Sequence, residues 1–159
     1  MPYLFSACEI ARLAAQVEAK GAGFYRCLQS VSQEPQVAEM CAFLAGQETQ
    51  HETRFLRMAE AHAGSEQMHE YSVDIGRMMK STVSWLEDFY AKHGPEHGTP
   101  ADAEESLALA ADLEEQSVET YSRMREVYIS RFSPLIEKIL QEEQQHLRTV
   151  AELRNSLGT

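Results

Sequence analysis

The sequence predicts an all-α protein, a four-helix bundle whose second and third helices are joined by a long crossover that carries an additional helix. Four long segments repeat apolar residues at the spacing i, i+3, i+4 and i+7, which places them on one face of a helix. The two halves of the chain also resemble each other with an offset of about 96 residues. Two short connections and one long connection are typical of a bundle with a single crossover. At 159 residues the chain is expected to form one domain over residues 1–159.

The first helix is expected from about Ser6 to Ser30, and the second from Pro35 to about Ala61. Ser6 and Glu9 form a capping-box pattern at the first start, and a proline suits the first turn of the second. The expected inward residues are, in the first helix, Ile10, Leu13, Ala14, Val17, Gly21, Tyr25 and Leu28 and, in the second, Met40, Leu44, Phe55 and Met58.

The crossover is expected to contain an amphipathic helix from about Val73 to Lys92, between loop-like stretches at 64–65 and 93–98. Trp85 is expected to pack this helix against the bundle or against a second subunit. The apolar stripe of this helix consists of Ile75, Met79, Val83, Leu86 and Phe89 or Tyr90.

The third and fourth helices are each preceded by a hydroxyl residue followed by proline, which indicates an N-cap and a proline in the first turn. Thr99-Pro100 is therefore expected to start the third helix, which runs to about Ile129. Ser133-Pro134 is expected to start the fourth, which runs to about Leu157.

Composition excludes several classes of function. A formal net charge of −11 argues against nucleic acid and against anionic membrane surfaces as partners. Neither a signal peptide nor an apolar stretch of about 20 residues is visible, so the expected location is the cytoplasm. The three cysteines (Cys8, Cys27 and Cys41) have no CxxC spacing, and we expect reduced thiols.

A carboxylate and histidine pattern occurs twice in the chain. Glu18 is followed by the ExxH motif of Glu48 and His51, and Glu114 is followed by that of Glu143 and His146. Glu114 follows Glu18 by 96 residues, and His146 follows His51 by 95. Because residues i and i+3 lie on one face of a helix, each Glu and His pair can reach one point. All six residues fall on the inward stripes.

Buried carboxylates are costly unless they are paired, and no basic residue falls in the stripe of Glu18. Divalent cations are the natural compensation, so the pattern predicts a site for two metal ions. We expect Glu18 and Glu114 to be terminal ligands, Glu48 and Glu143 to bridge, and each histidine to bind one ion. Such ligands suit iron or manganese and would accept zinc or cobalt.

The alternative interpretation is a coincidence of solvated helix faces. A single ExxH is weak evidence, since Glu66 and His69 also form one without a leading glutamate. We assign that motif to the surface.

Tyr25 and Tyr121 each follow the leading glutamate of their own helix by seven residues, too far to contact it. In an antiparallel neighbour each could reach the opposite glutamate, which predicts the pairs Tyr25 with Glu114 and Tyr121 with Glu18. The alternative is core tyrosines that bond backbone carbonyls. Gly21 and Ser117, three residues after each leading glutamate, leave room for a small ligand or for close helix packing.

At these residues the chain resembles the rubrerythrin-like di-iron proteins of the ferritin-like superfamily, from about Ser6 to Leu157. The resemblance implies a ferritin-like fold, an oxo- or hydroxo-bridged di-iron centre held by the six ligands, chemistry with hydrogen peroxide or dioxygen, and a homodimer. Full-length rubrerythrins carry a rubredoxin domain with two CxxC pairs, and this sequence has none, so a separate electron donor such as a rubredoxin is expected. They also place an extra ligand glutamate where this chain has Ser117, so six ligands are expected.

The leading hypothesis is therefore a di-iron oxidoreductase that reduces peroxide or dioxygen, with Tyr25 and Tyr121 assisting as catalytic residues. A second hypothesis is an iron-binding or iron-sequestering protein without turnover. A third is a helical bundle stabilised by structural zinc.

Overall fold

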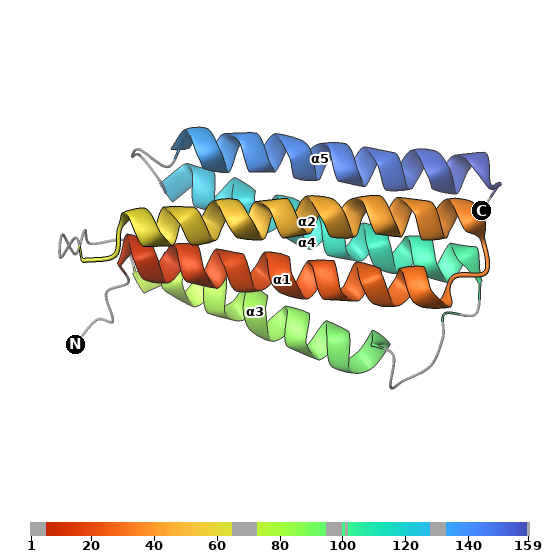
Figure 1. Cartoon of the computed structure of the whole chain (residues 1–159), viewed down its shortest axis with the longest axis horizontal. Helices are drawn as coiled ribbons and strands as arrows, with labels where there is room; N and C mark the ends of the chain where they lie inside the picture. The colour runs from red at the N-terminus through yellow and green to blue at the C-terminus, as the bar shows by residue number, and fades with distance from the viewer. Residues whose placement is uncertain (1–5, 65–72, 95–99, 101, 128–132, 159) are drawn as a thin grey trace.

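Five helices make up the described part of this computed structural model, which comprises residues 6–64, 73–94, 100, 102–127 and 133–158. Four of them lie side by side along the length of the molecule, and α3 lies outside them at an incline (Figure 1). The predicted all-α bundle with a helix in its crossover is confirmed. The helices are α1 (Ala7–Val31), α2 (Pro35–Ala61), α3 (Val73–His93), α4 (Ala103–Val127) and α5 (Ser133–Ser156).

The crossover connects α2 to α4 by way of α3, as the direction of the chain in Figure 1 shows. Helices α1 and α2 form one antiparallel hairpin, and α4 and α5 form another. Helix α2 ends at the end of the bundle where α3 begins, and α3 carries the chain back along the bundle. As a result, α2 and α4 run in the same direction, as the single long connection requires.

Local side-chain chemistry sets the first two helix starts as predicted. The Ser6 hydroxyl accepts a hydrogen bond from the Glu9 amide at 3.1 Å, and the Glu9 carboxylate accepts one from the Ser6 amide at 2.7 Å. This capping box satisfies two amides that the helix itself leaves unpaired. Pro35 occupies the first turn of α2, where its missing N–H costs nothing.

The start of α4 differs from the prediction. The helix begins at Ala103, so Pro100 lies before it and not in its first turn. The Asp102 carboxylate accepts a hydrogen bond from the Glu105 amide at 2.9 Å and serves as the cap. A cap nearer the helix therefore replaces the one predicted at Thr99, which lies outside the described residues, as does Ile129.

The predicted inward residues of α1 and α2 are buried, except Leu13, which is partly buried. In α3, Met79, Leu86 and Phe89 are buried, Val83 is partly buried, and Tyr90 is exposed; the side chain of Ile75 lies outside the description.

Aromatic contacts attach α3 to the bundle. The ring centroids of Phe89 and Phe24 in α1 lie 4.9 Å apart, and Trp85 stacks on Phe89 with the centroids 4.8 Å apart. Trp85 therefore supports the contact between α3 and the bundle, as expected. Among the described helices, none combines the length and apolar character needed to cross a bilayer.

Candidate metal centre

The six predicted ligand residues come together in the middle of the bundle, and none is more than 3% exposed. Helices α1 and α4 each contribute one glutamate. Helices α2 and α5 each contribute a glutamate and a histidine, which share one helix face because they are three residues apart. The ligand atoms fall into two groups, in each of which every atom lies within 4.8 Å of the others.

The first group surrounds the Nδ1 atom of His51. This nitrogen lies 2.7 Å from Glu143, 3.3 Å from Glu18 and 3.7 Å from Glu48. Metal–ligand bonds of about 2.1 Å place neighbouring ligand atoms roughly 3.0–3.4 Å apart. The observed distances bracket that range, so these four residues fit one metal ion. We call them the His51 subsite.

The second group surrounds the Nδ1 atom of His146 in the same way. This nitrogen lies 3.5 Å from Glu48, 3.5 Å from Glu114 and 3.6 Å from Glu143. We call these four residues the His146 subsite. The two imidazoles stack with their centroids 5.7 Å apart and an angle of 19° between the rings.

Glu48 and Glu143 belong to both subsites, and each of them presents one oxygen to each histidine. Oε2 of Glu48 is the atom near His51, and Oε1 is the atom near His146. Glu143 divides its oxygens likewise, with Oε1 near His51 and Oε2 near His146. Two carboxylates that each face two subsites have the arrangement predicted for bridging ligands, while Glu18 and Glu114 each belong to one subsite.

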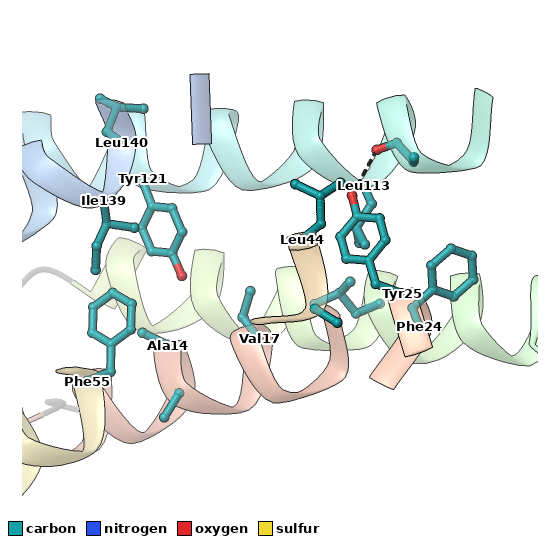
Figure 2. Close-up of a cluster of buried hydrophobic side chains, with 14 of the residues drawn as sticks. Ala14, Val17, Phe24, Tyr25, Leu44, Phe55, Leu113, Tyr121, Ile139 and Leu140 are labelled. Atoms are coloured by element: carbon teal, nitrogen blue, oxygen red, sulfur yellow. Dashed lines mark hydrogen bonds between the residues drawn. The ribbon is translucent and has the colours of Figure 1, made fainter. Parts of the chain in front are cut away.

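The tyrosine pairs predicted across the bundle are confirmed. The Tyr25 hydroxyl donates to Glu114 at 2.5 Å, and the Tyr121 hydroxyl donates to Glu18. Tyr25 also lies 3.3 Å from the carbonyl oxygen of Ala110, so the alternative backbone partner is present as well. Figure 2 shows both rings directed into the interior from their own helices, with Tyr121 beside Phe55. Each tyrosine thus fixes the terminal carboxylate of the opposite hairpin.

Gly21 lies directly against a shared carboxylate. A Cβ atom at this position would lie 3.6 Å from Cγ of Glu48, which is ordinary van der Waals contact. The volume next to Gly21 is thus bordered by Glu48, and a Cβ atom would fit there without a clash. Ser117 in α4 is partly buried.

Burial and mutual repulsion shift the pKa values of the cluster. Burial raises the pKa of Glu18 and of Glu114 well above the usual value, and the charge of Glu48 adds to the effect. Burial alone would lower the pKa of both histidines, but the negative charge of the surrounding carboxylates raises it instead. Burial and the negative charge of the neighbouring carboxylates thus both act on the cluster. The cluster therefore favours protons or cations.

Several of these buried polar atoms have no hydrogen-bond partner within the described chain. They are Oε2 of Glu114, both carboxylate oxygens of Glu143, and Nδ1 of His146. Unpaired buried polar atoms are costly, and all of these point into the cluster. Four carboxylates carry a formal charge of −4, which two divalent cations would balance. The residues therefore fit a pair of metal ions.

The sequence matches the family described as Rubrerythrin over residues 9–154. The chain belongs to the rubrerythrin family. This is a ferritin-like di-iron family, so the family and the geometry agree on a metal centre. Comparisons with curated proteins and with solved structures give no significant match.

Two residues beside this rubrerythrin centre were missed in the sequence. The Glu142 carboxylate lies 2.8 Å from Nε2 of His51 and accepts a hydrogen bond from Arg54 at 2.6 Å. Ligand histidines usually donate their second ring N–H to a carboxylate, so a search for such a partner could have found Glu142. Arg54 follows His51 by three residues, on the same side of α2.

None of the three cysteines belongs to this cluster of described residues. The three cysteines are free thiols, with Cys41 buried and the others partly buried. Burial raises the pKa of Cys41 to about 12, which makes it an inert core residue. The ExxH motif of Glu66 and His69 falls outside the described residues.

Proposed function

We propose that this rubrerythrin-family protein is a di-iron oxidoreductase that reduces hydrogen peroxide or dioxygen with electrons from a separate donor. The observation that supports this most is the pair of buried subsites joined by Glu48 and Glu143. A shared pair of carboxylates brings two ions close enough to act on one small substrate, whereas a single structural site needs no such sharing.

In this proposal, Glu18 and His51 would hold one iron ion, Glu114 and His146 would hold the other, and Glu48 and Glu143 would bridge them. Two iron ions held there would supply the two electrons that, with two protons, reduce one peroxide to two water molecules. Carboxylates are suited to the bridging positions because each can bind through one oxygen or two as the charge of the centre changes.

Tyr25 and Tyr121 are proposed to orient the terminal carboxylates and to hold protons beside the centre. Burial and the adjacent Glu114 carboxylate raise the pKa of Tyr25 well above its usual value. Its hydroxyl therefore stays protonated and remains a hydrogen-bond donor to Glu114. Catalytic assistance by the two tyrosines is part of the proposal.

The partners are proposed from the sequence. A rubredoxin or similar one-electron donor would re-reduce the iron, because the three cysteines of this sequence include no CxxC pair. A homodimer and a cytoplasmic location stay predictions from the sequence.

The test is peroxide consumption by iron-reconstituted protein under anaerobic conditions with excess reduced rubredoxin. We expect many peroxide molecules to be reduced per chain, at a rate proportional to the protein concentration. Glu48→Ala should abolish this turnover, and Glu39→Ala, which removes an exposed glutamate of the same helix, should retain it.

The alternatives predict other results. One equivalent of oxidation per iron pair, with no further consumption of peroxide, would favour the iron-sequestering protein. Zinc as the metal of the purified protein, without redox activity after exchange for iron, would favour a structural site.

A further inference from the structure

The imidazole of His51 has partners on both of its nitrogens. Its Nδ1 atom faces the three carboxylates of the His51 subsite, and its Nε2 atom lies 2.8 Å from Oε2 of Glu142. The same oxygen of Glu142 accepts a hydrogen bond from Arg54. His51 is fully buried, whereas the side chains of Glu142 and Arg54 are each 27% exposed. A charged pair at the surface of the bundle therefore extends to a ligand in its interior.

The internal repeat gives Glu142 and Arg54 a corresponding position each in the other half of the pattern. With the 95-residue offset of the two histidines, Gln47 corresponds to Glu142 and Thr149 corresponds to Arg54. Both are uncharged, and the Thr149 hydroxyl donates to the carbonyl oxygen of Gln145. The repeat positions that correspond to Glu142 and Arg54 therefore hold no carboxylate and no arginine.

The surroundings of His146 differ from those of His51 in two further respects. Nδ1 of His146 has no hydrogen-bond partner in the described chain, and neither does Oε2 of Glu114. The ring centroids of His146 and Phe43 lie 6.3 Å apart in a T-shaped arrangement, and Phe43 is 53% exposed. An exposed phenyl ring restrains an imidazole less than a charge-assisted hydrogen bond does.

We propose that Glu142 and Arg54 are positioning residues that hold His51 ready for metal, so that the His51 subsite binds its ion more tightly than the His146 subsite. This rests on the proposed two-metal centre. An imidazole that donates its Nε2 proton to a carboxylate has a fixed orientation and presents the Nδ1 lone pair to the metal. The same hydrogen bond makes Nδ1 a stronger ligand. Partners of this kind typically change metal affinity by about 10–100-fold.

Arg54 acts through Glu142. Its guanidinium group holds the Glu142 carboxylate in place through the 2.6 Å contact with Oε2. Removing Arg54 should therefore weaken the same metal-binding step as removing Glu142, by a smaller factor.

The test is an anaerobic titration of the metal-free full chain with Co²⁺, followed by calorimetry and by visible absorption. The wild type should bind two ions in two steps, with dissociation constants about 10–100-fold apart. In Glu142→Gln the first step should weaken by about that factor, so that the two steps merge; Arg54→Met should cause part of this change. Glu152→Gln, which removes an exposed carboxylate from the same helix, should leave both steps unchanged.

A merely structural role would lower the melting temperature of the metal-free variants and weaken both steps equally. Two equal steps in the wild type, or equal weakening of both steps in Glu142→Gln, would overturn this inference and leave the two-metal proposal standing. Failure of the wild type to bind a second ion would overturn both.

Discussion

The hairpin of α1 and α2 and the hairpin of α4 and α5 supply the same set of candidate ligands but surround them differently. Each hairpin provides a terminal glutamate, a shared glutamate, a histidine and a tyrosine that crosses to the other hairpin. The second partner of the histidine differs: His51 has Glu142 and Arg54, while the corresponding positions of the repeat are Gln47 and Thr149. The two halves of the repeat therefore have the same residue types at the candidate ligands and different residue types around them.

In the proposed centre, this difference separates the residues that would bind metal from those that would only position them. Neither hairpin completes a subsite by itself, because each subsite takes three residues from one hairpin and one shared glutamate from the other. Substituting any ligand would leave the remaining buried charges unbalanced. The outer partners only adjust a subsite that is already complete, so they can differ between the two halves.

The largest effect is expected from removing a shared carboxylate. Glu48→Ala takes a ligand from both subsites, so the iron content after reconstitution should fall from two ions per chain to one or none. Metal analysis by mass spectrometry measures this directly. Glu39→Ala is the matched control on α2, and two irons retained in Glu48→Ala would mean that the two hairpins do not share this ligand.

Metal removal should weaken the connection between the hairpins. Because ions that bind only the folded state stabilise it, a free metal concentration 100-fold above Kd contributes about 2.7 kcal/mol, or roughly 5–10 °C in melting temperature. Calorimetry of the chain with and without a chelator measures this shift. Equal melting temperatures in the two samples would contradict a metal centre that links the hairpins.

The tyrosines test the symmetry of the two halves. Tyr25→Phe and Tyr121→Phe each remove one buried hydrogen bond to a carboxylate and keep the ring, so each should lower the free energy of unfolding by about 1–3 kcal/mol. Urea denaturation of the metal-free chains gives both values. Similar losses would support equivalent roles, and a loss confined to one variant would limit the repeat to the ligands.

Gly21→Ala should have the smallest effect. The added Cβ would make ordinary contact with Glu48, and alanine favours a helix interior over glycine by about 0.8–1 kcal/mol. We therefore expect a small gain in the free energy of unfolding and an unchanged content of two ions. Loss of one ion would show that the space beside Gly21 is needed by the centre.

The sequence predicted the convergence of the six glutamate and histidine residues and the tyrosine pairs because helical periodicity determines which residues share a face. Once Glu18 and Tyr25 share a face and the hairpins pack together, the position of Tyr25 opposite Glu114 follows from helix geometry. Helical periodicity does not predict the contact of Glu142 with His51, because this contact depends on how long side chains of α2 and α5 meet. The start of α4 was missed because two cap signals lie close together and Asp102 is the one used.

The proposed function requires that the chain hold two metal ions between its hairpins. Metal analysis of anaerobically purified protein, with an optical spectrum recorded before and after the addition of peroxide, tests it most directly. We predict about two irons per chain and near-ultraviolet absorption typical of an oxo bridge after oxidation. No bound metal, or a single ion per chain after reconstitution with iron, would contradict the account.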